Sequence, residues 1–320
     1  MAQIKYQEAV YIVEENESVL DCLLRNEISV SYSCKNGTCQ TCMMQALDGT
    51  PPPQAQKSLK DTLKAQNYFL ACQCHPTENM IIGQTGLQVE SVVKQIQRLN
   101  EQVVELILSP QDDFDYYPGQ FVHLIRDDGL VRSYSIASYR NGSTDLHLHV
   151  QRVPNGRMSN WIHDELNVGD TVSVRGPAGD CFYVSGNPEQ PLLLVGTGTG
   201  LAPLYGIAQD ALLQNHQGEI YLYHGSLRRE GLYLVDKLRE LEAHFPNFHY
   251  VPCVLQGEPE EGIVIGNIES TSLAVAANFK GWRVYLCGNP DLVFSLRKQV
   301  FLKGASSRDI FSDAFILTKN

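Results

Sequence analysis

Four cysteines have the spacing of a loop that binds iron. Cys34, Cys39 and Cys42 are separated by four and then two residues within "SYSCKNGTCQTCMM", and Cys72 follows after 29 more. This spacing is typical of plant-type 2Fe–2S clusters, which are held by four thiolates. The loop is small and polar, and Gly37 lets its backbone approach a ligand closely or adopt a positive φ. We therefore expect these four cysteines to bind a 2Fe–2S cluster.

Zinc is the main alternative for this loop. Structural zinc usually takes two C-x2-C pairs, whereas this chain has one such pair, Cys39 with Cys42. Cys74 lies two positions after Cys72, and the spacing favours Cys72 as the ligand and Cys74 as a neighbouring thiol. Three further cysteines stand apart from this motif and are expected to be small buried residues: Cys22, Cys181 and Cys253.

Composition limits the class of protein. The chain has 320 residues, enough for two or three domains, and a net charge of −11 without a basic stripe, which argues against nucleic-acid binding. No apolar run approaches the roughly 18 residues of a membrane span, and the N-terminus has no signal-peptide pattern. We expect a cytoplasmic protein with no membrane segment, in which nine cysteines are not a disulfide framework.

The elements around the cysteines indicate a small β-rich domain. "KYQEAVYIV" alternates like a strand, Ser18 is a plausible N-cap for a helix that starts at "VLDCLL", and "PPP" at 51–53 breaks regular structure. Residues 1–86 resemble the 2Fe–2S ferredoxin domain of bacterial NADH-dependent oxygenase reductases, and "FLACQCHP" is similar to that family's fourth-ligand segment. The resemblance implies a β-grasp-like fold here.

Short strands with turn signals follow from residue 88, as in an antiparallel barrel. "RSYSIAS", residues 132–138, resembles the flavin motif of the ferredoxin–NADP reductase superfamily. The resemblance implies that Tyr134 stacks on the flavin ring, that Arg132 holds the pyrophosphate and that Ser135 lies near the reactive nitrogen. An aromatic ring and a guanidinium suit a flat ring and a diphosphate.

A second phosphate element is expected in "VPNGRMSNWI", residues 153–162. Gly156 opens a turn before a predicted helix that carries Arg157 and Ser159, and backbone N–H groups at a helix start bind phosphate. Two phosphate elements favour FAD over FMN. "GPAGDCF", residues 176–182, is similar to the turn that closes this domain in the superfamily.

The third region reads as alternating strands and helices, the pattern of a doubly wound parallel sheet. "LLLV" followed by "GTGTG" resembles the superfamily's nicotinamide-nucleotide turn, in which glycines let a pyrophosphate approach a helix N-terminus. The predicted nucleotide-binding residues of this turn are Gly196, Thr197, Gly198, Thr199 and Gly200.

Two later motifs complete the expected active site. "CGNP", residues 287–290, matches the superfamily's C-G-x-P, which implies that Cys287 and Gly288 lie against the nicotinamide. "FSDAFIL" resembles the superfamily's D-x-F ending, which implies that Phe315 shields the flavin. Ser135, Cys287 and Phe315 are therefore the predicted catalytic residues. The resemblance favours NADH, although Arg228 and Arg229 could pair with the 2′-phosphate of NADPH.

The sequence thus predicts a multidomain α+β and α/β protein. Its expected domains are a ferredoxin domain (1–86), a flavin-binding antiparallel β-barrel (87–187) and a nicotinamide-binding α/β domain (188–320). By resemblance, electrons pass from NADH through FAD and the cluster to a partner oxygenase or deoxysugar dehydrase. A monomer is expected when free. The alternatives are a free-standing NAD(P)H flavin or ferric reductase and a non-enzymatic redox carrier or sensor.

Overall fold

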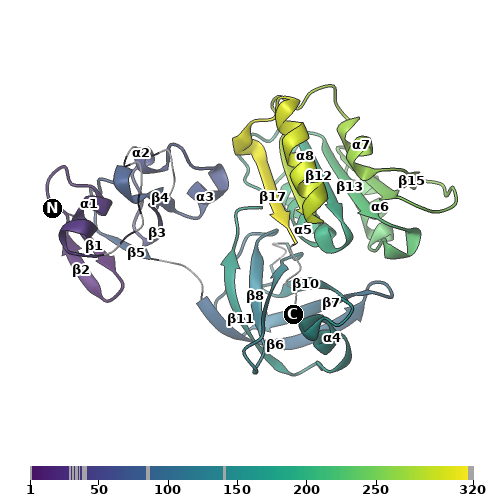
Figure 1. Cartoon of the computed structure of the whole chain (residues 1–320), viewed down its shortest axis with the longest axis horizontal. Helices are drawn as coiled ribbons and strands as arrows, with labels where there is room; N and C mark the ends of the chain where they lie inside the picture. Colours follow the sequence, from purple (N-terminus) through teal and green to yellow (C-terminus); the bar gives the residue numbers. More distant parts are fainter. Residues whose placement is uncertain are drawn as a thin grey trace. The chain divides into compact units, whose positions relative to one another are not determined.

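The computed structural model describes residues 2–28, 30, 32, 35, 37, 42–83, 87–139 and 142–315. The chain divides into two compact units, Met1–Gly86 and Leu87–Asn320 (Figure 1). The first unit contains one sheet, and the second contains two. The finer domain boundaries, 1–86, 87–187 and 188–320, stay predictions.

The first unit is built on a mixed five-stranded sheet in the order β2-β1-β5-β3-β4. β1 pairs in parallel with β5, and the other neighbouring pairs are antiparallel. The strands are β1 (Gln3–Tyr6), β2 (Ala9–Ile12), β3 (Met43–Asp48), β4 (Tyr68–Leu70) and β5 (Met80–Gly83). The single strand expected at "KYQEAVYIV" is therefore a hairpin, because Gln7 adopts a positive φ and turns the chain.

Short helices pack on this sheet: α1 (Val19–Arg25), α2 (Pro53–Gln56), α3 (Asp61–Ala65) and the 3₁₀ turn η1 (Ala71–Gln73). Ser18 caps α1, since its hydroxyl accepts a hydrogen bond from the Asp21 N–H at 3.1 Å. Leu20 and Leu23 of α1 join the buried core with Phe69. The proline run begins a helix rather than excluding one, because Pro53 occupies its first turn, where no N–H is needed.

In the second unit, the first sheet is antiparallel with the order β10-β7-β6-β11-β8-β9. A bridge between Ile136 and Leu148 joins the two ends of this order, so the sheet closes as a barrel. Its strands and its one long helix are β6 (Leu87–Arg98), β7 (Val103–Pro110), β8 (Phe121–Ile125), β9 (Val131–Ser135), β10 (Leu146–Gln151), β11 (Thr171–Ala178) and α4 (Arg157–Asp164).

The other sheet of this unit is parallel, with the order β15-β14-β13-β12-β16-β17. Its strands are β12 (Leu192–Thr197), β13 (Ile220–Ser226), β14 (Phe248–Val254), β15 (Val264–Ile265), β16 (Arg283–Gly288) and β17 (Ile310–Ala314). The α-helices that follow or precede them are α5 (Leu201–Leu213), α6 (Val235–His244), α7 (Ile268–Leu273) and α8 (Pro290–Leu302), and the 3₁₀ turns are η2 (Gly198–Gly200), η3 (Arg229–Gly231) and η4 (Ser307–Asp309).

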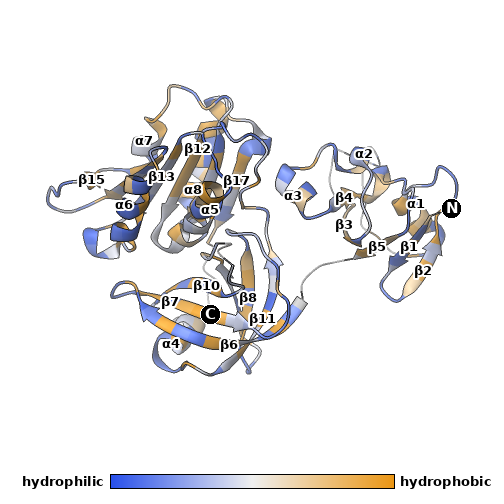
Figure 2. Ribbon diagram, turned by 180° about the vertical axis from the view of Figure 1, so that it is seen from behind, coloured by the Kyte–Doolittle hydropathy of each residue, from blue (hydrophilic) through white to orange (hydrophobic). Residues whose placement is uncertain are grey.

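Helices cover both faces of the parallel sheet. Side chains of α5 and α6 share one buried cluster with Leu192 and Leu194, and side chains of α7 and α8 share another with Leu193 and Val195. Figure 2 shows the strands of this sheet as mostly hydrophobic and α6 as largely hydrophilic. The predicted combination of an antiparallel barrel and a doubly wound parallel sheet is confirmed.

Across the described residues, every helix falls short of the length and apolar character that a membrane crossing requires.

Candidate functional site

Two of the four predicted cluster ligands, Cys42 and Cys72, lie among the described residues, whereas Cys34 and Cys39 lie outside them. Cys42 directly precedes β3 and Cys72 lies in η1, and the Ala71 N–H donates to the Cys42 carbonyl at 3.0 Å. Both thiols are buried. Burial and the adjacent Cys72 thiol raise the pKa of Cys42 to about 11. The fold therefore brings together two cysteines that are 30 positions apart.

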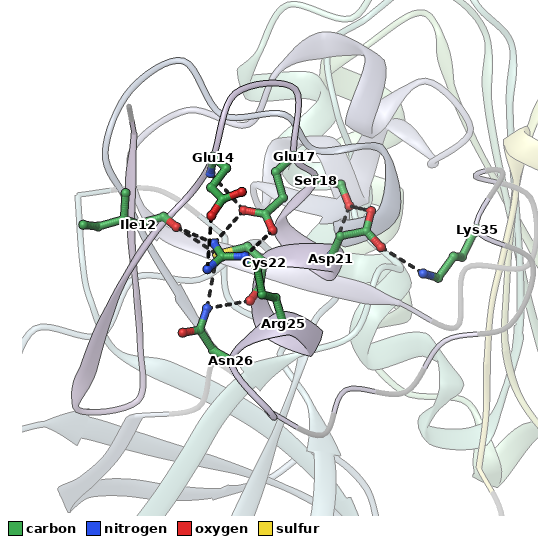
Figure 3. A network of polar contacts seen from close by, with 9 residues as sticks. All are labelled: Ile12, Glu14, Glu17, Ser18, Asp21, Cys22, Arg25, Asn26 and Lys35. Carbon is green, nitrogen blue, oxygen red and sulfur yellow. Dashed lines mark hydrogen bonds and ion pairs between the residues drawn. The ribbon is translucent and has the colours of Figure 1, made fainter.

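The described parts of the cysteine loop are held from several sides. The Ser58 hydroxyl donates to the Gly37 carbonyl at 2.7 Å, and the Lys35 ammonium pairs with Asp21 at 2.8 Å (Figure 3). Gly37 has a φ of +80°, and a Cβ there would come within 3.0 Å of Gln73. A close turn of this kind fits the loop that a four-thiolate cluster requires.

Cys74 lies in the same core cluster as Cys72 and is more deeply buried. Its side chain is completely buried in the apolar core of the first unit, and burial raises the pKa of its thiol to about 12. The choice of Cys72 rather than Cys74 as the fourth ligand stays a prediction from the spacing.

A cavity of about 1470 Å³ opens in the second unit. Most sites for a single drug-sized ligand have roughly 300–1,000 Å³, so this cavity has room for more than one nucleotide. It is lined by residues from both sheets of this unit, including most of the predicted cofactor-binding set: Arg132, Tyr134, Ser135, Gly156, Arg157, Ser159, Thr197, Gly198, Thr199 and Gly288. The predicted catalytic residue Phe315 also lines it, whereas Gly196, Gly200 and Cys287 do not.

The flavin motif lies on β9 at one side of this cavity. Tyr134 is half-buried against the barrel core, and burial raises the pKa of its hydroxyl well above the ordinary value. Its neighbour Arg132 presents a guanidinium that also donates to the Val131 carbonyl at 2.8 Å. An aromatic ring next to a fixed guanidinium suits a flavin with its diphosphate.

The second predicted phosphate element is the start of α4. Gly156 is the N-cap, and the Ser159 hydroxyl accepts from the Val153 N–H at 3.1 Å, which fixes the turn. Arg157 forms an ion pair with Asp128 at 2.8 Å. The backbone N–H groups of this helix start fit a phosphate, whereas Arg157 already has a carboxylate partner.

The glycine-rich turn joins β12 to α5. A Cβ on Gly200 would come within 2.4 Å of the Cys287 carbonyl oxygen, and one on Gly288 would come within 2.6 Å of the Thr197 carbonyl oxygen. Gly288 also has a φ of +110°. Both positions require glycine, because two backbone segments meet there without side chains between them. Thr197, Gly198 and Thr199 of this turn line the cavity, beside the start of α5.

Ser135 has a partner that sequence reasoning did not identify. Its hydroxyl donates to the carboxylate of Asp313 at 2.9 Å, from a position 178 residues away. Burial raises the pKa of Asp313, the nearby Asp180 adds to this, and the hydrogen bond from Ser135 lowers it in part. The motif "FSDAFIL" contains this aspartate, so its position beside Phe315 was the available signal.

The third predicted catalytic group, Cys287, lies behind the cavity wall. Its side chain is fully buried, while the next residue, Gly288, lines the cavity. Its Sγ lies 3.9 Å from that of Cys181, so Cys181 is buried as expected but is not isolated. Asp313 on β17 is its register partner, and the Phe315 N–H donates to the Gly288 carbonyl at 2.8 Å. These contacts gather the ends of β16 and β17 beside Ser135.

Comparison with known proteins agrees with this arrangement. Residues 3–77 match the 2Fe-2S iron-sulfur cluster binding domain, residues 91–183 the oxidoreductase FAD-binding domain and residues 194–298 the oxidoreductase NAD-binding domain. A ferredoxin–NAD(P)⁺ reductase component of the naphthalene 1,2-dioxygenase/salicylate 5-hydroxylase systems of a Ralstonia species is 30% identical over 94% of both chains. The chain belongs to the oxygenase reductase family.

Two other relatives of this reductase show the range of the family. The CDP-6-deoxy-L-threo-D-glycero-4-hexulose-3-dehydrase reductase of Yersinia pestis is 27% identical over 97% of this chain and 96% of its own. The crystal structure of the Amycolatopsis cytochrome P450 reductase GcoB is similar with a TM-score of 0.69 and 28% identity, over 98% and 99% of the two chains. The present chain is therefore an oxidoreductase that uses FAD, a 2Fe–2S cluster and a nicotinamide nucleotide for electron transport.

Proposed function

We propose that this reductase passes electrons from NADH to a partner protein, an oxygenase or a deoxysugar dehydrase component. The observation that carries the proposal is that the flavin motif of β9 and the glycine-rich turn after β12 line the same cavity. A hydride donor and its acceptor must lie in contact, and this cavity presents both motifs to one space. The named relatives, which act in oxygenase and dehydrase systems, support the choice of partner.

The chain's own residues divide the work of binding and orientation. We propose that Tyr134 stacks on the flavin ring, that Arg132 and the start of α4 hold its pyrophosphate, and that the turn from Gly196 to Gly200 holds the nicotinamide nucleotide. When bound, FAD exchanges the electron pair of a hydride for single electrons, and the cluster carries one electron at a time. Cys34, Cys39, Cys42 and Cys72 are the proposed ligands of the cluster.

Ser135 and Asp313 are the proposed polar pair beside the reacting atoms. The hydroxyl is small enough to leave room for a nicotinamide, and its hydrogen bond to Asp313 fixes its direction. The raised pKa of Asp313 suits a group that holds or releases a proton there. Cys287 and Phe315 flank this pair from the ends of β16 and β17.

The preference for NADH has a structural argument. Arg229, which could bind a 2′-phosphate, forms an ion pair with Glu260 at 3.2 Å. Glu260 lies in an acidic loop with Glu258 and Glu261, and the cavity includes the nearby Ser226 and Leu227 at the end of β13. We propose that the adenosine ribose binds near this end of β13, where these carboxylates would repel a 2′-phosphate and so favour NADH.

Cofactor content and acceptor choice test the proposal. Anaerobically purified protein should contain iron, acid-labile sulfide and FAD in a ratio of about two to two to one. A one-electron protein acceptor should be reduced faster than added free flavin or ferric citrate. Zinc in place of iron, or a preference for free flavin or ferric ions, would favour the free-standing reductase instead. The proposal includes a cytoplasmic location and a monomer when free, and light scattering after gel filtration checks the latter.

A further inference from the structure

Gln73 directly follows the proposed ligand Cys72 and has a half-buried side chain. Its amide nitrogen, Nε2, carries two hydrogens and lies within donor distance of three acceptors: the Cys72 sulfur at 3.7 Å, the Cys72 carbonyl oxygen at 3.0 Å and the Lys35 carbonyl oxygen at 3.2 Å. One of its hydrogens is therefore shared between two acceptors. Gln73 therefore contacts two segments that are 38 residues apart in the chain, and each lies next to a proposed ligand in the sequence.

The cysteine loop lies directly against this side chain. A Cβ on Gly37 would come within 3.0 Å of the Gln73 Cγ, so the loop backbone packs on the aliphatic part of the glutamine. The Ser58 hydroxyl holds Gly37 from another side, and Asp21 at the start of α1 holds the Lys35 side chain (Figure 3). Ser18 in turn donates to Asp21 at 2.7 Å. Among the described residues, Gln73, Ser58 and Asp21 each hold a part of the loop.

An N–H donor beside the Cys72 sulfur affects the reduction potential of the cluster. Reduction of a 2Fe–2S cluster adds one negative charge, which is spread in part over its sulfur ligands. An N–H directed at a ligand sulfur stabilises that charge and so raises the reduction potential. The carboxamide of Gln73 is neutral, so it supplies this donor without adding a charge.

We propose that Gln73 is a positioning residue of the 2Fe–2S site, which braces the loop at Lys35 and Gly37 and raises the potential of the cluster through its N–H donor to Cys72. The proposal rests on Cys72 as a ligand, as stated under the proposed function. A raised potential favours transfer of electrons from the flavin to the cluster. Gln73 acts through Cys72 and Lys35.

The test is a redox titration of the cluster, followed by electron paramagnetic resonance, in the full-length protein. Gln73→Met keeps the length of the side chain and removes the donor, and Gln73→Glu replaces the donor with an acceptor. Both should lower the potential, Gln73→Glu more strongly. The expected size is about a tenfold change in the ratio of reduced to oxidised cluster at a fixed potential, or about 59 mV for one electron.

Matched controls separate this effect from a general one. Gln54 is an exposed glutamine of the same unit, and Gln54→Met should leave the potential unchanged. The FAD potential and the reduction of ferricyanide by NADH should also be unchanged in both Gln73 variants. If Gln73→Met loses labile sulfide while it keeps FAD, the bracing of the loop is supported. The reduction potential of the cluster is then measured in Gln73→Glu.

An intact cluster with the wild-type potential in Gln73→Glu, or in both variants, would overturn the proposal. A wrong ligand set would give a different result. The cluster would then survive in Cys72→Ser, whatever the Gln73 variants show. The two failures are therefore distinguished by iron and sulfide content on one side and by the potential on the other.

Discussion

At the scale of residues, the contact between Ser135 and Asp313 makes the clearest prediction. Asp313→Asn keeps an oxygen that can accept the Ser135 hydrogen bond, but it removes a carboxylate that is beside the expected reaction centre. We expect NADH-dependent reduction of ferricyanide to fall about a hundredfold in kcat, the usual loss when a general acid or base is removed, with little change in KM. Retained FAD absorbance is the control, and unchanged kcat would exclude Asp313 from the reaction.

Asp313→Asn should lower activity but raise the stability of the fold. Burial raises the pKa of Asp313, so the folded protein binds a proton at this group more tightly than the unfolded chain. The ionised carboxylate therefore costs stability as the pH rises above its unfolded pKa, and this cost is absent at lower pH. Asp313→Asn should raise Tm at pH 7 and have a smaller effect near pH 4, as measured by calorimetry. A lower Tm at pH 7 would contradict the assignment.

Tyr134 tests the flavin motif. Tyr134→Ala should weaken FAD binding about tenfold or more, because it removes an aromatic surface and its stacking, worth about 1 kcal/mol beyond burial. Tyr134→Phe keeps the ring and should bind FAD nearly as well as the wild type. Fluorescence titration of the apoprotein measures both, and equal affinity in Tyr134→Ala would remove the tyrosine from the flavin site.

The pair of Arg229 and Glu260 tests nucleotide choice. Glu260→Gln releases Arg229 from its carboxylate and lowers the negative charge of the loop. We expect kcat/KM for NADPH to rise severalfold while that for NADH changes little, since exposed ion pairs are worth about 0–1 kcal/mol. Glu258→Gln lowers the charge of the same loop by the same amount but keeps the ion pair of Arg229 with Glu260, so it separates the loop charge from the release of Arg229. A clear NADPH preference in the wild type would mean that the arginines outweigh the acidic loop.

At the scale of elements, a buried polar cluster links the barrel to the parallel-sheet half of the second unit. Glu105 on β7 contacts His147 on β10 at 3.0 Å, and His149 on β10 contacts the hydroxyl of Tyr233 at 3.1 Å. His149 lies 3.7 Å from Glu105. Burial favours the neutral form of Glu105, but the two histidines outweigh it and hold its pKa well below the ordinary value.

Glu105→Gln should therefore destabilise the protein by about 1–3 kcal/mol at pH 7, the cost of an unmatched buried partner. Because the native pKa of Glu105 is lowered, its contribution is present above the unfolded pKa and is lost as the pH falls below it. The difference from the wild type should be constant above about pH 5 and shrink as the pH falls below 4.5, as measured by urea unfolding. Glu101→Gln, an exposed neighbour, is the control, and a pH-independent difference would reject this role.

The elements also show what the sequence can predict. Most strand and helix identities and the capping role of Ser18 follow from local patterns, because they depend on residues a few positions apart. The contacts of Ser135 with Asp313 and of Cys181 with Cys287 join positions more than 100 residues apart. They arise because β9, β16 and β17 end at one place, and periodicity does not specify which strand ends meet.

Arg157 illustrates the same limit at the cofactor site. The motif around Gly156 predicts a phosphate-binding turn, and the fold places that turn on the cavity. The ion pair of Arg157 with Asp128 depends on a hairpin 29 residues earlier, so the local pattern could not reveal it. The assignment of Arg157 to the cofactor-binding set stays a prediction.

At the scale of the whole molecule, we expect electrons to enter at the cavity of the second unit and to leave through the cluster of the first unit. The two units have separate buried cores, so loss of the cluster should leave FAD and nicotinamide binding intact. The variant Cys72→Ser removes one proposed ligand, and Cys74→Ser changes a buried thiol only two positions away in the same core. Comparison of these two variants separates the effect of losing the cluster from a general effect on the fold.

The most direct test compares two acceptors in these two variants. With NADH as donor, Cys72→Ser should reduce ferricyanide at close to the wild-type rate, because this small acceptor can reach the flavin. It should lose nearly all reduction of cytochrome c, while Cys74→Ser keeps both activities and the cluster spectrum. If Cys72→Ser lacks the cluster and still reduces cytochrome c at the wild-type rate, the cluster is not the exit for electrons and the central claim is wrong.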